Sequence, residues 1–311
     1  MELDTGILTE EERIIFALRA LYRAAGYTLF KMSKFEEYDL YARNKDFLIS
    51  ENVITFTDAG GALMALKPDV TLSIVRASRD EPGTVRKLCY NENVYRPASH
   101  GGPFRELTQA GLECIGAVGD AEIAETLELA LQSLRCVAGE TPCALSVSHL
   151  GILREKLDGL LLPEEKRDAA LRCVQQKNAH ELESLCAGEA DAEAVEAVKR
   201  LLRLSGPARD VLPELDKLCR GGAAAAVELL RRVTAGLDGN VNIDFSIAGN
   251  LKYYNGIVFN GYVEGVPAAV LTGGQYDQLL RKLGRDSRAI GFAVYVDLLE
   301  RLPETEVTGH E

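Results

Sequence analysis

The alternation of hydrophobic and polar positions divides the chain into three stretches. Residues 1–149 mix helical and strand-like patterns, residues 150–239 are almost purely helical in pattern, and residues 240–311 return to strand patterns punctuated by glycine. This order is typical of one domain that is interrupted by an insertion. We therefore expect an α+β core formed by residues 1–149 and 240–311, with a helical insertion at 150–239.

The first helix is predicted from its ends as well as from its apolar positions. Thr9 and Glu12 have the spacing of a capping box, in which each side chain satisfies a free backbone donor of the other residue. Apolar residues then recur at helical spacing as far as Ala25, and Gly26 suits the end of a helix. A second helix is expected from Asp120.

Further elements are expected along the whole chain. The predicted strands are 27–31, 53–57, 143–148, 241–247, 256–263, 268–272 and 289–296. The helices predicted for the insertion are near 150–158, 164–186, 190–204, 209–219 and 222–235, with shorter helices at 276–283 and 297–302. The apolar positions of the insertion are those that a small helical bundle needs.

Composition narrows the class of protein. With 47% hydrophobic and 26% charged residues the chain is typical of a folded soluble protein, and its net charge of -12 argues against nucleic acid as a partner. The sequence contains neither a membrane-spanning apolar run nor a targeting peptide. Seven cysteines without a CxxC pair indicate reduced thiols and a cytoplasmic location, and four scattered histidines make a metal site improbable. We expect no cofactor.

Several polar residues are placed where a binding site would need them. Gln109 and Glu113 alternate within an apolar run, so they would share one face of a strand, where a carboxylate is unfavourable unless it contacts something polar. Asp69 adds a second carboxylate, and the adjacent Tyr253 and Tyr254 add hydroxyls on apolar rings. Such a set suits a small cationic or zwitterionic ligand.

Each of these features taken alone is more often structural. A Gln/Glu pair on a strand is commonly half exposed, a double tyrosine commonly belongs to a core, and Asp69, which follows Pro68, could cap a helix. The interpretation as a site therefore depends on the features occurring together.

Taken together, these segments resemble a known family. In order and spacing they are similar to the catalytic core of histidyl-tRNA synthetases and their paralogues, and the similarity extends over residues 8–302. The matching segments are LKPDVT at 66–71, QAGLECIG at 109–116, YYNGIVF at 253–259, GGQYD at 273–277 and GFA at 291–293. The resemblance implies a class II aminoacyl-tRNA synthetase-like antiparallel sheet flanked by helices, with a helical insertion. Because the sequence stops near residue 311, where a synthetase continues, we expect no anticodon-binding domain.

The resemblance also implies a binding site for histidine. Its residues would be Asp69, Thr71, Arg96, Gln109, Glu113, Tyr253 and Tyr254. The first two fall where the family binds the α-amino group, and the two tyrosines fall where it recognises the imidazole ring. The arginine corresponds to that of the family's FRxE motif.

The chain departs from the family's pattern where a synthetase binds ATP. The catalytic arginine of the family aligns with Gly249 and the ATP-binding arginine with Leu298. The FRxE glutamate is missing after Arg96, GGRYD has Gln275, and the proline of the dimer motif is Ser33. Loss of a single charged donor from such a site typically lowers the rate by about 10²–10⁵-fold. The amino-acid half of the site is kept and the nucleotide half is not.

One group of paralogues shows this combination, the regulatory subunits of ATP phosphoribosyltransferase. The resemblance implies a subunit that is not itself an enzyme, that acts in histidine biosynthesis, and that assembles with a short-form catalytic subunit as a hetero-octamer. It further implies a homodimer through the core and histidine as a feedback effector. Two alternatives remain open: an active histidine-adenylating enzyme without a tRNA domain, and a synthetase-like protein with some other partner.

Overall fold

The structure is a computed structural model that describes residues 5–48, 52–97, 102–237, 240–248, 251 and 253–301. Its α-helices are α1 (Glu10–Ala24), α2 (Tyr38–Ala42), α3 (Thr71–Ala77), α4 (Asp120–Ala138), α5 (Leu150–Asp158), α6 (Glu164–Gln175), α7 (Ala179–Cys186), α8 (Ala192–Arg203), α9 (Ala208–Leu218), α10 (Gly222–Thr234) and α11 (Asp277–Lys282). Short 3₁₀ helices cover Thr5–Ile7, Lys45–Phe47 and Val296–Arg301.

The strands form two sheets. They are β1 (Thr28–Leu29), β2 (Phe35–Glu37), β3 (Thr55–Thr57), β4 (Leu63–Leu66), β5 (Val85–Pro97), β6 (Phe104–Gly116), β7 (Cys143–His149), β8 (Ser205–Pro207), β9 (Val241–Asp244), β10 (Ile257–Val263), β11 (Leu271–Gln275) and β12 (Arg288–Tyr295). The large sheet has the order β1-β5-β6-β12-β11-β10-β7-β9-β8, and the small sheet has the order β2-β4-β3. The predicted α+β class is thus confirmed.

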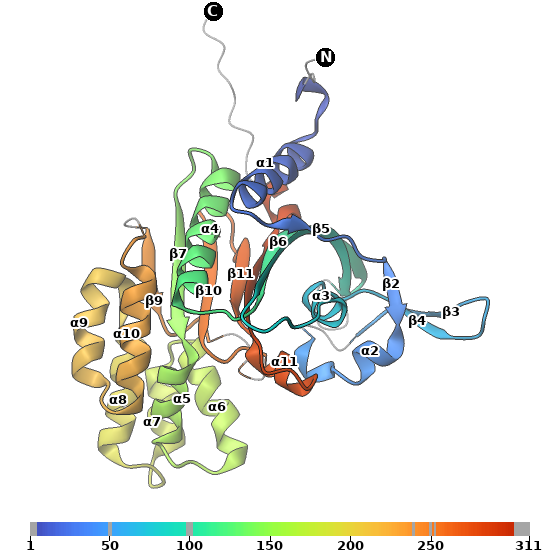
Figure 1. Cartoon of the computed structure of the whole chain (residues 1–311). Helices are drawn as coiled ribbons and strands as arrows, with labels where there is room; N and C mark the ends of the chain where they lie inside the picture. The colour runs from blue at the N-terminus through green and yellow to red at the C-terminus, as the bar shows by residue number, and fades with distance from the viewer. Residues whose placement is uncertain are drawn as a thin grey trace, which may run out of the picture.

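The large sheet is antiparallel over the strands that matter for function. Only the β1–β5 and β7–β9 pairs are parallel, so β5, β6, β12, β11, β10 and β7 form a continuous antiparallel surface. The helices α1 and α4 pack on one face of this surface, whereas α3 lies on the other face, where β5 and β6 curve around it (Figure 1). Two apolar clusters follow this division, one between the sheet and α1 and α4, and one around α2, α3 and α11.

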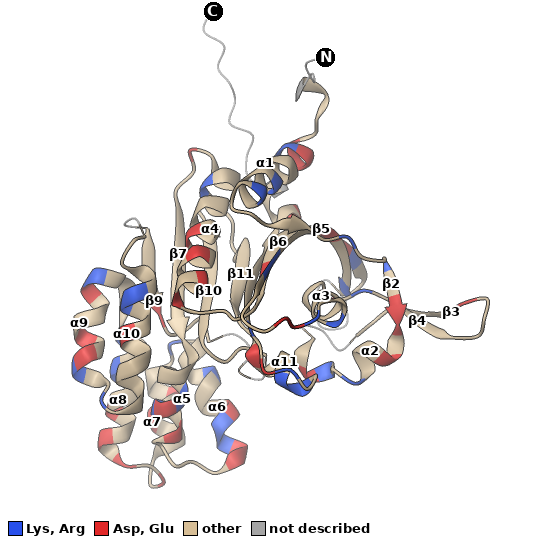
Figure 2. Cartoon of the chain, in the orientation of Figure 1, with Lys and Arg blue, Asp and Glu red and all other residues tan. Residues whose placement is uncertain are grey.

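The helices α5 to α10 gather at the β9 end of the large sheet (Figure 1). Both acidic and basic residues occur on these helices (Figure 2), and along α8 the acidic residues precede the basic ones. This segment is joined to the sheet, because β8 pairs with β9 and α10 packs against α4. The division of the chain at 149 and 240 stays a prediction.

Local chemistry explains where several helices begin and end. The capping box of the first helix is confirmed, since the Glu12 backbone N–H donates to Thr9 Oγ1 at 3.2 Å and the Thr9 N–H donates to Glu12 Oε2 at 2.9 Å. The single helical stretch expected at 164–186 is instead two helices. Lys177 has a φ of 53° between them, and the Asn178 side chain caps the second helix.

Two predicted strand boundaries were also wrong. The strand expected at 241–247 ends at Asp244, because the Asp244 carboxylate accepts from the backbone N–H of Ser246 and turns the chain. The strand expected at 268–272 lies at Leu271–Gln275, where the pairing with β12 places it. Within the described ranges, no helix is long and apolar enough to span a bilayer.

Candidate ligand-binding site

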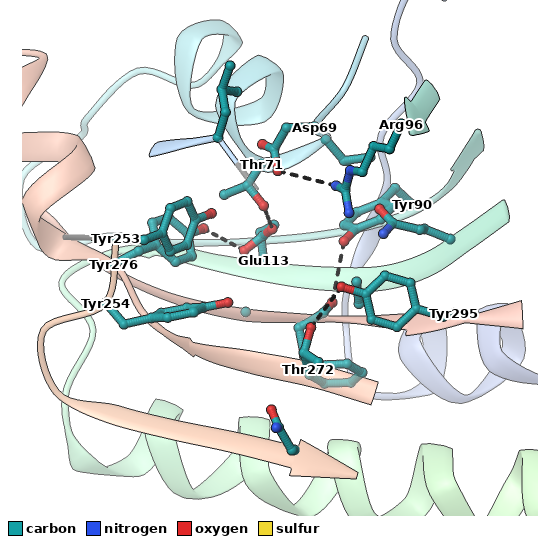
Figure 3. Close-up of a pocket in the computed structure, with 17 residues that line it drawn as sticks. Asp69, Thr71, Tyr90, Arg96, Glu113, Tyr253, Tyr254, Thr272, Tyr276 and Tyr295 are labelled. Atoms are coloured by element: carbon teal, nitrogen blue, oxygen red, sulfur yellow. Dashed lines mark hydrogen bonds and ion pairs between the residues drawn. The ribbon is translucent and has the colours of Figure 1, made fainter. Parts of the chain in front are cut away.

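A cavity of about 350 Å³ opens on the α3 face of the large sheet. All seven residues that the sequence singled out line it: Asp69, Thr71, Arg96, Gln109, Glu113, Tyr253 and Tyr254. They come from the start of α3, from β5 and β6, and from the loop before β10, and they converge on a single space (Figure 3). Segments more than 180 residues apart in the chain are thereby brought together.

The floor of the cavity is made of strand positions with little or no side chain. Glu113 on β6 lies opposite Gly291 on β12, and the next cavity-facing pair is Gly111 and Ala293. A Cβ atom at position 291 would lie 1.8 Å from Glu113 Oε2, and a Cβ atom at 111 would lie 2.6 Å from the Tyr90 hydroxyl. Glycine is therefore required at both positions to leave room for the polar groups above the sheet.

Glu113 is held from two sides by hydroxyl groups. Thr71 Oγ1 donates to Oε1 at 2.6 Å, and the Tyr276 hydroxyl donates to Oε2. The carboxyl group is fully enclosed, and burial raises its pKa to about 8. The two hydrogen bonds oppose this rise, and repulsion from Asp69 adds to it. At neutral pH the unliganded cavity therefore keeps Glu113 mostly protonated.

Asp69 serves both the helix and the cavity. Its Oδ1 accepts from the backbone N–H of Leu72 at 2.8 Å in the first turn of α3, which is the capping role that the sequence left open. Its Oδ2 lies 3.7 Å from Arg96 Nη2 and faces the cavity. Burial raises the pKa of Asp69, and the nearby guanidinium lowers it again in part.

Arg96 is fixed by the segment that precedes α3. Its Nε donates to the carbonyl of Pro68 at 2.5 Å, and its side chain is almost fully buried. Lys67, the residue before Pro68, forms a second contact of this kind. Its buried ammonium pairs with Glu92, which lies on the same strand as Arg96. Both contacts attach the segment before α3 to β5, so they fix the position of the α3 N-terminus over the sheet.

The side chain of Gln109 has an unpaired hydrogen-bond donor. The side chain is 2% exposed, and its amide Nε2 has no hydrogen-bond partner within the described part of the chain. A buried donor without an acceptor costs about 1–3 kcal/mol. A ligand that brings an acceptor, such as a carboxylate, would remove this cost.

Tyrosines form much of the remaining wall. The rings of Tyr253 and Tyr254 meet edge to face with their centroids 4.6 Å apart. The centroids of the Tyr253 and Tyr276 rings are 5.9 Å apart. Burial, reinforced by the neighbouring carboxyl groups and phenols, raises the pKa of all three phenols, so they stay protonated and can donate hydrogen bonds.

Sequence reasoning missed three further tyrosines of the wall, Tyr90, Tyr276 and Tyr295. Tyr276 lies within the GGQYD segment and Tyr295 follows GFA, so the matching segments contained or adjoined them without indicating where they point. Tyr90 lies in none of the matching segments. It reaches the cavity because β5 pairs with β6 in a register that puts Tyr90 opposite Gly111.

The residues that depart from the synthetase pattern do not line the cavity where they are described. Leu298 packs against the apolar cluster under α1 and α4. The Gln275 amide oxygen accepts from the backbone N–H of Ile257 at 2.7 Å, and Ser33 Oγ accepts from the N–H of Phe35. Gly249 lies outside the described residues. In the described ranges no cluster of His, Cys, Asp and Glu could hold a metal ion.

The chain has relatives of known name. The family model for histidyl-tRNA synthetase matches residues 6–299. An ATP phosphoribosyltransferase regulatory subunit from Caldanaerobacter subterraneus is 32% identical over 90% of this chain and 75% of the relative. A protein of the same name from Anaeromyxobacter dehalogenans is 34% identical over 89% of this chain and 82% of the relative.

Solved structures agree with this fold. An ATP phosphoribosyltransferase regulatory subunit/histidyl-tRNA synthetase from Bacillus halodurans has a TM-score of 0.82 at 25% identity, covering 100% of this chain and 84% of that one. The ATP phosphoribosyl transferase (HisG:HisZ) complex from Thermotoga maritima has a TM-score of 0.72 at 20% identity, covering 94% and 97%. These likenesses confirm the predicted class II synthetase-like fold.

Proposed function

The chain belongs to the family of ATP phosphoribosyltransferase regulatory subunits, and from this premise we propose that it is a non-catalytic subunit that binds histidine in the cavity described above. In this role it activates a short-form catalytic subunit, forms a homodimer through the core and a hetero-octamer with that partner, and conveys feedback inhibition by histidine. We propose a cytoplasmic location and no nucleic-acid partner, in keeping with a biosynthetic role.

The observation that carries the proposal is the complementarity of the cavity to a free amino acid. Asp69 and Thr71 stand together at the start of α3, where a ligand ammonium would find a carboxylate and a hydroxyl acceptor. The unpaired amide of Gln109 offers a donor to the ligand carboxylate. Tyr253 and Tyr254 supply flat surfaces and hydroxyls for an imidazole ring.

The position of Glu113 suits a hydrogen bond with the imidazole ring of the same ligand. It lies between Thr71 and Tyr276 on the floor, where an imidazole N–H could donate to its ionised carboxylate. A charged acceptor at this point would make the hydrogen bond about twice as strong as a neutral one. A ligand that lacks an N–H at the corresponding ring position should therefore bind poorly.

The adenylating alternative lacks the charges that it needs. Stabilising the phosphates of ATP requires fixed cations, and the aligned positions hold Gly249 and Leu298. Leu298 packs against the apolar core, and its side chain offers the phosphates neither a charge nor a hydrogen-bond donor. The assay that separates the two functions is histidine-dependent exchange of pyrophosphate into ATP, for which we expect no activity above background.

Regulation requires that histidine binds one arrangement of the complex more tightly than another. A coupling free energy of about 1–3 kcal/mol is typical of such systems. The experiment that tests the proposal measures phosphoribosyltransferase activity of a short-form catalytic subunit with and without this chain, titrated with histidine. We expect activation by the chain and inhibition that depends on Glu113. Unchanged activity on adding the chain, or inhibition that the Glu113→Gln variant leaves intact, would contradict the proposal.

A further inference from the structure

One bulky side chain interrupts the shallow floor of the cavity. Along β12 the cavity-facing residues are Gly291, Ala293 and Tyr295, in that order toward the end of the strand. The first has no side chain and the second has only a methyl group. The floor is therefore open beside Glu113 and is closed by an aromatic ring at Tyr295.

Tyr295 is held in this position at two points. Its hydroxyl lies 3.0 Å from Thr272 Oγ1 on β11, and its backbone N–H donates to the carbonyl of Val270 at 2.8 Å. Tyr295 is only partly buried, whereas Gln109 and Glu113 are almost fully buried. Its ring lies on the side of the cavity opposite Tyr253 (Figure 3).

Tyr295 lies close to the residue that would bind the carboxylate end of the ligand. It lies directly opposite Gln109 in the β6–β12 pairing, and residues so placed have Cβ atoms about 5 Å apart. The Gln109 amide is the donor that lacks an acceptor, which places the ligand carboxylate beside it. The Tyr295 ring therefore lies where any group attached to that carboxylate would extend.

We propose that Tyr295 makes the site specific for an amino acid with a free α-carboxylate. The inference rests on the proposed histidine site and adds the class of ligand that the site rejects, namely amino acids whose carboxyl group is joined to a further residue, an ester or a nucleotide. Rejection by a fixed side chain is a repulsive contribution to specificity, which acts without strengthening the binding of the accepted ligand.

The test compares three ligands by isothermal titration calorimetry with the full-length chain. L-histidine is the reference, L-histidyl-glycine extends the carboxyl end, and glycyl-L-histidine extends the amino end instead. The variants are Tyr295→Ala, which removes the ring, and Tyr295→Phe, which keeps the ring without its bond to Thr272. Tyr95→Ala serves as the matched control, because Tyr95 is also partly buried and hydrogen-bonded but lies outside the cavity.

We expect the unaltered chain to bind L-histidine and to bind L-histidyl-glycine at least about tenfold more weakly. Tyr295→Ala should recover at least about tenfold in affinity for L-histidyl-glycine and gain nothing for glycyl-L-histidine. Tyr295→Phe should still bind L-histidyl-glycine more weakly than L-histidine, because it keeps the ring, and Tyr95→Ala should behave as the unaltered chain. Thermal unfolding curves confirm that each variant is folded.

Two results would overturn the inference while leaving the histidine site intact. One is equal affinity of the unaltered chain for L-histidine and L-histidyl-glycine. The other is a folded Tyr295→Ala variant that binds L-histidine and still rejects L-histidyl-glycine. Failure of the unaltered chain to bind L-histidine would instead remove the proposed function, and the inference with it.

Discussion

Replacing Glu113 with glutamine should abolish the part of the pH dependence of histidine binding that this carboxyl group causes. Burial raises its pKa to about 8, so the unliganded cavity holds it mostly protonated at neutral pH. A ligand N–H that donates to the carboxylate favours the ionised form. Binding at neutral pH therefore includes the release of a proton from Glu113.

The size of the effect follows from the pKa. A group with a pKa of about 8 is ionised in about a tenth of the molecules at pH 7 and in about half at pH 8. When only the ionised form binds, the observed affinity is proportional to that fraction. The affinity of the unaltered chain should thus rise about fivefold from pH 7 to pH 8, rise by a further factor of about two by pH 9, and then level off.

The Glu113→Gln variant should lack this rise. Glutamine cannot ionise, and losing a hydrogen bond to a charged group should weaken binding at pH 8 by about 1.5–3 kcal/mol. Calorimetry at several pH values, in two buffers of different ionisation enthalpy, measures both the affinity and the protons released. Because histidine itself titrates identically in every experiment, the difference between the two proteins isolates Glu113.

The control is Glu106→Gln, on the same strand. Glu106 is exposed and accepts from Asn93 and Tyr95, and it does not line the cavity. This variant should keep the pH profile of the unaltered chain. Parallel pH profiles for the unaltered chain and Glu113→Gln would refute the reasoning, since they would show that Glu113 does not change its protonation on binding.

Four further outcomes are expected. In the folded chain the pKa of Glu113 is raised from its usual value of 4.5 to about 8, so the stability of the fold falls as the pH rises from about 4.5 to about 8. Glu113→Gln should therefore raise the melting temperature of the unliganded chain more at pH 8 than at pH 5. Gln109→Leu should leave the melting temperature of the unliganded chain unchanged or higher but weaken histidine binding by about 1–3 kcal/mol in calorimetry, because it removes an unpaired donor. Gly291→Ala should abolish histidine binding in the same assay, since the added methyl group collides with the Glu113 carboxylate. Lys67→Ala should lower the free energy of unfolding in urea by about 3–5 kcal/mol, because it leaves Glu92 without its buried partner.

The sequence was sufficient to predict the strand that carries two of the site residues. The alternation of Gln109, Gly111 and Glu113 placed the three positions on one face of β6, and the structure puts Gln109 and Glu113 in the cavity wall. The capping box at Thr9 was equally predictable, because its two bonds join residues only three positions apart. Local patterns of this kind depend on a few adjacent residues, so they can be recognised in the sequence before the fold is known.

The rest of the site depends on contacts across the sheet. Tyr90 and Tyr295 reach the cavity only because β5 and β12 pair with β6 in a particular register, opposite Gly111 and Gln109. No local pattern encodes the register between β12 and β6, which are far apart in the chain, and the register between the consecutive strands β5 and β6 depends on the loop that joins them. The break at Lys177 was missed for a related reason, since the residues on both sides of it have helical patterns and only the backbone conformation interrupts them.

The unliganded cavity gathers several groups whose environment is unfavourable. Two carboxyl groups are buried close enough to repel each other, and one amide donor lacks an acceptor. A zwitterionic ligand would relieve both conditions, so its binding free energy would include a contribution that an ordinary apolar pocket could not provide. The segment that would respond is the start of α3, because Thr71 contacts Glu113 and Arg96 holds the carbonyl of Pro68. This segment is attached to β5 as well as to the cavity, so a change in its contacts on binding would also alter its contacts with the sheet. Regulation of a partner would require that histidine binds one of the two resulting arrangements more tightly than the other.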